Sequence, residues 1–108
     1  MSAPSERYDA GTVSDFEPGT LRRVQAGGRV VAVARIEDDF YAIGDVCSHE
    51  DVSLSEGELD VDECTLECAK HGSLFSLETG AALTLPALKA VPVYEIECVD
   101  GNVWVVVQ

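Results

Sequence analysis

The chain has 108 residues, 46% of them apolar, and a formal net charge of −13 from 20 acidic and 7 basic residues. This length suits one domain, which we expect over residues 1–108, and the acidic balance argues strongly against nucleic-acid binding, which needs lysine and arginine at the phosphates. The longest strongly apolar run, residues 103–107, is far shorter than the ~20 residues of a membrane-spanning helix, and residues 1–7 lack the apolar segment of a secretory signal, so we expect a cytoplasmic protein with no membrane contact.

Short apolar or alternating runs, each ended by a turn signal, predict an all-β fold. In chain order the expected strands are residues 8–13, 21–25, 29–36, 40–45, 64–66, 74–77, 91–99 and 103–107. Hairpin turns are predicted at Ala26-Gly27-Gly28, Glu37-Asp38-Asp39 and Asp100-Gly101-Asn102. Residues 46–62 and 69–73 interrupt this rhythm and are expected to be loops, the first with one helical turn near residues 52–56. Loops held by a rigid scaffold are where chemistry usually lies.

Both histidines and two of the four cysteines lie in or beside these loops, as Cys47-Ser48-His49 and Cys68-Ala69-Lys70-His71. Each half offers one thiolate and one imidazole from a single turn of chain, which suits a metal whose ligands must lie a few ångströms apart. The candidate metal ligands are therefore Cys47, His49, Cys68 and His71. A structural Cys₂His₂ zinc site is the alternative, although such sites usually pair cysteine with cysteine and histidine with histidine.

The Cys-x-His and Cys-x-x-His halves, with Gly72 and Phe75 after the second, resemble the motif of the Rieske family. Leu54-Ser55-Glu56-Gly57 resembles the segment that closes the first cluster loop, and Leu85-Pro86-Ala87 resembles the proline loop that covers the cluster. The resemblance implies a Rieske fold of small antiparallel sheets with two cluster-binding loops and a covering proline loop. It also implies one [2Fe-2S] cluster per chain, with Cys47 and Cys68 on one iron and His49 and His71 on the other.

The ligand set also bears on the reduction potential. Two neutral imidazoles in place of thiolates make the cluster less negative, and Rieske centres span about −150 to +300 mV against about −400 mV for plant-type ferredoxins. High-potential members have a disulfide between the ligand loops and a tyrosine hydroxyl on a ligand sulfur. Here Lys70 and Phe75 occupy two of those positions, which predicts a low potential. Ser73 matches a serine that donates to a bridging sulfide in high-potential members, and its hydroxyl would raise the potential slightly.

By this resemblance the protein is the ferredoxin component of a multicomponent aromatic-ring dioxygenase system. It would be a one-electron carrier, not an enzyme, between a flavin-dependent ferredoxin reductase and a terminal oxygenase. The chain has no glycine-rich nucleotide loop for direct reduction by NADH, and no further histidine for a mononuclear iron site. The alternative is a Rieske-like accessory protein in iron-sulfur assembly or nitrite reduction, or a redox sensor.

Three other features lead to expectations. Residues 50–67 contain eight carboxylates and no lysine or arginine, which indicates either an ordinary solvated surface or a docking face that steers basic partners toward the cluster. Cys64 is expected to be a largely buried strand residue. Cys98 is in phase with Tyr94 and Ile96, so we expect it to face the core as a small apolar side chain.

Overall fold

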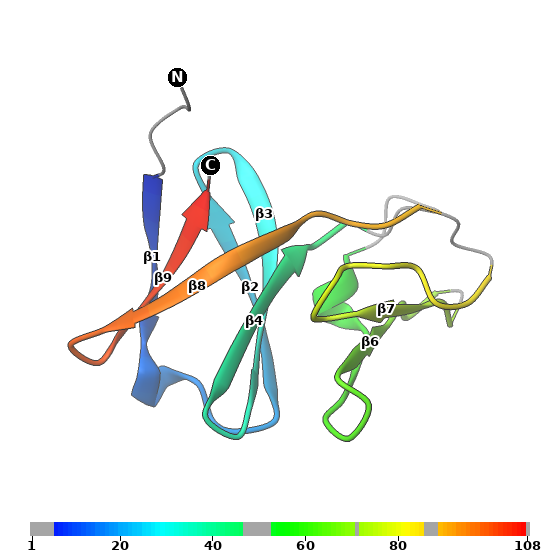
Figure 1. Cartoon of the computed structure of the whole chain (residues 1–108), viewed down its shortest axis with the longest axis horizontal. Coiled ribbons are helices and arrows are strands. Elements are labelled where there is room, and N and C mark those ends of the chain that lie inside the picture. The colour runs from blue at the N-terminus through cyan, green and yellow to red at the C-terminus, as the bar shows by residue number, and fades with distance from the viewer. Residues whose placement is uncertain (1–5, 47–52, 71, 86–88, 108) are drawn as a thin grey trace.

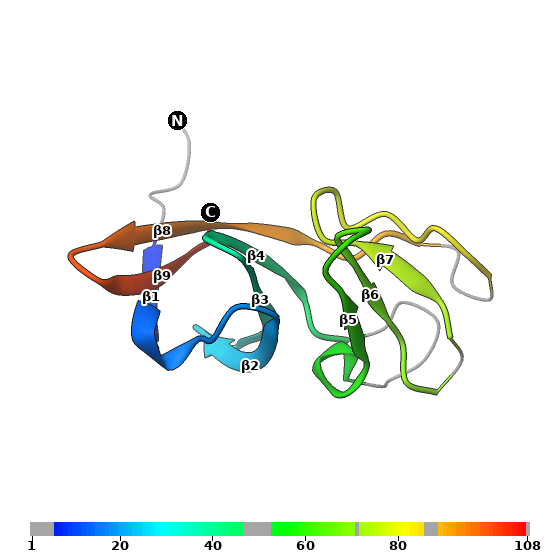
Figure 2. The same cartoon turned by 90° about the horizontal axis from the view of Figure 1, so that it is seen from below.

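The computed structural model of the chain describes residues 6–46, 53–70, 72–85 and 89–107. They form two antiparallel sheets that lie side by side, as Figures 1 and 2 show from two directions. The predicted all-β fold is confirmed, and helical structure in these residues is limited to the 3-10 turns η1 (Val13–Asp15) and η2 (Leu54–Glu56). The strands are β1 (Glu6–Thr12), β2 (Thr20–Ala26), β3 (Arg29–Ile36), β4 (Asp39–Gly44), β5 (Glu58–Asp60), β6 (Thr65–Glu67), β7 (Leu74–Ser76), β8 (Val93–Val99) and β9 (Asn102–Val107).

The larger sheet curls toward a closed barrel. Its strand order is β1-β9-β8-β4-β3-β2, and β8 starts near the smaller sheet, pairs first with β4 and then continues along β9 (Figures 1 and 2). The edge strands β1 and β2 approach each other where Tyr8 packs over Gly27. A Cβ on Gly27 would fall 2.2 Å from the Tyr8 hydroxyl oxygen, so this turn position accepts only glycine unless the ring moves.

Strand β3 separates two apolar cores because its side chains alternate between two faces. Val31 and Val33 face the interior of the barrel and pack with Val103 and Val105 of β9. The intervening side chains of β3 belong to a second core, which joins the barrel to the smaller sheet. Its buried members are Ala32, Ala34, Ile43, Leu54, Leu66, Cys68, Phe75, Leu77 and Val91.

The smaller sheet, β5-β6-β7, rests on this second core. Leu66 and Phe75 lie opposite each other on β6 and β7 and are both fully buried. Because Cys68 directly follows β6 and belongs to the same core, the second predicted ligand loop has a rigid apolar base.

The predicted strands lie within about two residues of the observed ones, the usual uncertainty of strand ends. One strand was missed, because residues 46–62 were expected to be loop and contain β5. The expectations for two cysteines were wrong. Cys64 lies in the turn before β6 with φ +56°, not in a strand, and Cys98 is exposed because β8 leaves the core near its end. No helix in the described residues is long and apolar enough to cross a membrane.

Candidate functional site

The first ligand loop leaves and rejoins the protein at one point. Val46 and Ser53 form an isolated antiparallel bridge, and the Leu54 N–H donates to the Asp45 carbonyl oxygen at 2.5 Å. Two predicted ligands, Cys47 and His49, lie between these anchors and outside the described residues, as do Glu50 and Asp51 of the acidic stretch. The described part therefore fixes the two ends of the loop.

Asp45 ties these ends together with its side chain as well. The Ser53 hydroxyl donates to Oδ2, and the Ser55 N–H donates to Oδ1 at 2.8 Å. The Arg23 Nε lies 3.4 Å from Oδ2, and the Asp45 N–H donates to the Val30 carbonyl of β3 at 3.0 Å. Sequence reasoning missed Asp45, because its bonds to Ser53 and Ser55 reach across the loop and only the structure shows them.

The second ligand loop is a tight turn between β6 and β7. The Gly72 N–H donates to the Cys68 carbonyl oxygen at 2.9 Å, and the Cys68 N–H donates to the Ser73 carbonyl oxygen at 2.8 Å. Gly72 has φ +73°, a left-handed conformation that glycine adopts without steric cost. Cys68 is 1% exposed, and His71 lies outside the described residues. Backbone hydrogen bonds therefore close this loop beside the predicted ligand Cys68.

The third loop is attached to β7. Ala82 bridges Phe75, the Leu83 N–H donates to the Leu74 carbonyl oxygen at 2.7 Å, and the Thr84 Oγ1 accepts from the Leu74 N–H at 2.8 Å. Leu83 and Leu85 are exposed, and 73% of the surface of Leu85 is accessible to solvent. The expected covering loop therefore begins as an apolar surface beside the second ligand loop, while Pro86 and Ala87 lie outside the described residues.

An acidic hollow opens beside the second ligand loop. Its volume is about 280 Å³, and Cys68 forms part of its lining. A neighbouring hollow of about 270 Å³ continues along β5 and shares Glu58 and Glu67 with it. The first hollow is lined by Glu56, Gly57, Glu58, Glu67, Cys68, Ala69 and Gly72. Carboxylates of the predicted acidic stretch thus lie next to a predicted ligand, at the place where a cationic side chain of a partner would be attracted.

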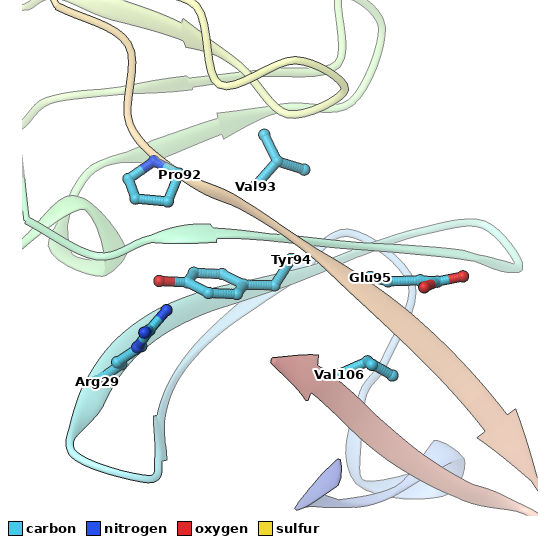
Figure 3. Close-up of a pocket in the computed structure, with 6 residues that line it drawn as sticks. All are labelled: Arg29, Pro92, Val93, Tyr94, Glu95 and Val106. Atoms are coloured by element: carbon cyan, nitrogen blue, oxygen red, sulfur yellow. The ribbon is translucent and has the colours of Figure 1, made fainter. Parts of the chain in front are cut away.

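Another hollow, of about 350 Å³, lies on the barrel beside β8 (Figure 3). Arg29 and Tyr94 point toward each other at its edge, with Pro92, Val93, Glu95 and Val106 around it. Its described lining does not include Cys68, the one predicted ligand that the structure describes, so the size of this hollow does not mark it as the site.

Cys64, which is not a predicted ligand, lies in a partly buried environment beside Tyr41. Burial raises the pKa of its thiol, and a hydrogen bond with the Tyr41 hydroxyl offsets this only in part. The same contact, followed by burial, raises the pKa of Tyr41. This pair packs against the second core at the opposite end of β6 from Cys68, so Cys64 lies apart from the predicted ligand.

A model of the Rieske [2Fe-2S] domain matches residues 6–95. The chain belongs to the Rieske [2Fe-2S] domain family. Ferredoxin CarAc of Metapseudomonas resinovorans is 44% identical to this Rieske protein over 93 residues, which cover 85% of each chain. The 3-phenylpropionate/cinnamic acid dioxygenase ferredoxin subunit of Escherichia coli (strain K12) is 37% identical over 99 residues, 92% of each chain.

Structural comparison agrees. A solved complex of reduced oxygenase and oxidized ferredoxin in carbazole 1,9a-dioxygenase matches this Rieske protein with a TM-score of 0.85 and 41% identity, covering 92% of this chain and 91% of that one. The resemblance to Rieske-type ferredoxins found in the sequence is therefore confirmed. A nitrite reductase small subunit of Mycobacterium tuberculosis has a TM-score of 0.88 at 22% identity, which shows a shared fold alone.

Proposed function

We propose that this Rieske protein carries single electrons from a flavin-dependent reductase to the terminal oxygenase of a dioxygenase system and is not itself the catalyst. The observation that carries the proposal is the match, over nearly the whole chain, to the ferredoxin of an oxygenase–ferredoxin complex. The relatives named as ferredoxin and ferredoxin subunit support the same role. The nitrite-reduction alternative has only a shared fold behind it.

The proposed ligands are Cys47 and Cys68 on one iron and His49 and His71 on the other, for one cluster in a single domain spanning residues 1–108. A Rieske cluster takes up one electron and returns it. Of the four ligands, Cys68 is in the described part, and its environment fits the role. Its side chain is buried beside a turn closed by backbone hydrogen bonds, and the residue forms part of the lining of an acidic hollow.

The scaffold supports electron transfer by holding the ligand loops on two sheets. Val46 and Ser53 anchor the first loop, and Cys68 and Ser73 anchor the second. Fixed loop ends limit the rearrangement that accompanies a change of charge, which favours rapid exchange of an electron. The exposed Leu83 and Leu85 and the acidic hollows provide an apolar and a charged surface near the second loop, and both suit brief contact with larger partners.

Reconstitution with the reductase and oxygenase of carbazole 1,9a-dioxygenase tests the proposal, because the ferredoxin of that system is a close structural match. We expect the NADH-driven reductase to bleach the visible absorbance of the Rieske protein, and the oxygenase to restore it. The Cys68→Ala variant, which lacks one proposed ligand, serves as the control and should show no bleaching. If the wild-type protein binds its cluster but is neither reduced by the reductase nor reoxidised by the oxygenase, the proposal is wrong.

A further inference from the structure

We infer that Asp45 is a positioning residue for the first ligand pair: its carboxylate fixes where residues 47–52 leave and rejoin the protein, and so sets how firmly Cys47 and His49 hold the cluster. The inference rests on the proposed ligand set. In this inference Asp45 acts by holding the ends of the loop that contains the ligands, and it does not itself bind iron.

The burial of Asp45 is the first argument. Among the residues that the structure describes, it is the only charged side chain that is buried, with 1% of its surface exposed. A buried carboxylate costs several kcal/mol unless hydrogen bonds or a counter-charge replace its water. Strand β4 ends one residue earlier, and an apolar side chain here would avoid that cost. The hydrogen bonds that the carboxylate accepts therefore have to offset the cost of burying it.

The two hydrogen bonds that the carboxylate accepts from Ser53 and Ser55 join the two ends of one loop. Ser53 and Ser55 donate to different oxygens of the carboxylate, so the side chain bridges two positions beyond residues 47–52. Leu54, between the two serines, is fully buried in the core that contains Cys68. Holding Ser53 and Ser55 therefore also holds the end of the first loop at a fixed place relative to the second ligand loop.

The restraint that Asp45 imposes acts close to the first ligand, because few covalent bonds separate the two residues. Asp45 precedes Cys47 by two residues, so their Cα atoms are at most about 7 Å apart. A carboxylate that restricts both ends of a short loop lowers the conformational entropy lost when its ligands bind iron. A ligand pair that is held in place releases metal slowly, because each broken bond can re-form before its partner breaks.

Asp45 and its partners Ser53 and Ser55 form what we call the Asp45 clamp, in which Arg23 has a smaller part. Its side chain is 60% exposed and its Nε lies 3.4 Å from the carboxylate, so solvent screens the ion pair. Replacing Arg23 should therefore change cluster retention much less than replacing Asp45, although both substitutions alter the same ion pair. This contrast separates the geometric role of Asp45 from a general effect of charge.

The experiment compares Asp45→Asn, Ser53→Ala, the double variant and Arg23→Gln with the wild-type holoprotein. The control is Asp15→Asn, because Asp15 also accepts a backbone N–H, from Thr12 at 2.9 Å, but in η1 at the far side of the barrel from the smaller sheet (Figure 1). The readouts are the half-life of the visible absorbance in an iron chelator, the EPR spectrum of the reduced protein, and the thermal midpoint of each apoprotein.

We expect Asp45→Asn to shorten the half-life of the cluster on the order of tenfold, the effect of losing one charge-assisted hydrogen bond, and to shift the EPR spectrum. Ser53→Ala should shorten it less, and the two changes should combine non-additively because they remove one interaction. Equal half-lives and spectra for Asp45→Asn, Asp15→Asn and wild type would overturn the inference, as would a lower apoprotein midpoint with an unchanged EPR spectrum. A wild-type protein without a cluster would instead overturn the proposed function.

Discussion

The Cα of Gly57 lies against the backbone carbonyl of Glu67, the residue that precedes Cys68. A Cβ at position 57 would fall 1.7 Å from that carbonyl oxygen and 3.2 Å from the carbonyl oxygen of Leu54. The requirement for glycine is one of space, since no backbone strain is involved. The contact joins the segment that closes the first ligand loop to the strand that leads into the second.

Gly57→Ala should therefore destabilise the protein by about 3 kcal/mol, because backbone atoms on both sides cannot move aside cheaply. Denaturant unfolding of the holoprotein measures the loss. Gly28→Ala is the matched control, because a Cβ there meets open space and the substitution adds only the strain of φ +84°. An effect of Gly57→Ala no greater than that of Gly28→Ala would refute the close approach.

The acidic hollows predict electrostatic steering of a basic partner. Glu58→Gln combined with Glu67→Gln should lower the second-order rate of electron transfer severalfold at low salt and flatten its dependence on ionic strength. Stopped-flow absorbance measures both. Asp100→Asn is the control, because it removes one charge at the far β8–β9 turn, where φ is +49° and asparagine is tolerated. A rate independent of salt in the wild-type protein would leave the acidic stretch as an ordinary solvated surface.

Ser73 is fully buried at the end of the second ligand loop, which is where a hydroxyl can act on a cluster sulfur. Ser73→Ala should lower the reduction potential on the order of tens of millivolts, because hydrogen bonds to sulfur favour the reduced state. Protein-film voltammetry gives the value, with Thr65→Val as a buried-hydroxyl control on β6. An unchanged reduction potential in Ser73→Ala would show that Ser73 does not tune the cluster.

The two cysteines outside the ligand set should differ in reactivity. Cys98 is exposed, whereas burial raises the pKa of the Cys64 thiol and leaves less of the reactive thiolate near pH 8. Mass spectrometry of holoprotein treated with iodoacetamide should find Cys98 modified first. The rate of Cys64 modification should keep rising with pH above the usual pKa of a thiol. Tyr41→Phe removes the hydrogen bond that lowers the Cys64 pKa and should slow Cys64 further. Faster labelling of Cys64 than of Cys98 would contradict the structure.

The sequence predicted the strands of the barrel because alternation and turn residues coincide there. Val31 and Val33 alternate with alanines that face a second core, and glycine or aspartate marks each hairpin. It missed β5, since Glu58 and Asp60 are poor strand formers and only the pairing with β6 makes the segment extended.

The position of a side chain at the end of a strand depends on tertiary context. Cys98 has the same alternation as Tyr94 and Ile96, but β8 has passed the edge of the core by then. Cys64 was misplaced because the Asp60 carboxylate accepts hydrogen bonds from the N–H groups of Asp62 and Glu63 and so extends the turn.

The ligand motif could be found in the sequence because its spacing is local, whereas the Asp45 clamp depends on contacts across the loop.

The most direct test of the account is the visible and EPR spectrum of protein purified without oxygen, together with its content of iron, acid-labile sulfide and zinc. We expect a red-brown protein that contains one [2Fe-2S] cluster per chain, and an EPR signal that appears on reduction and is lost in Cys68→Ala. A colourless protein that contains zinc and no labile sulfide would contradict the ligand assignment and the role of electron carrier.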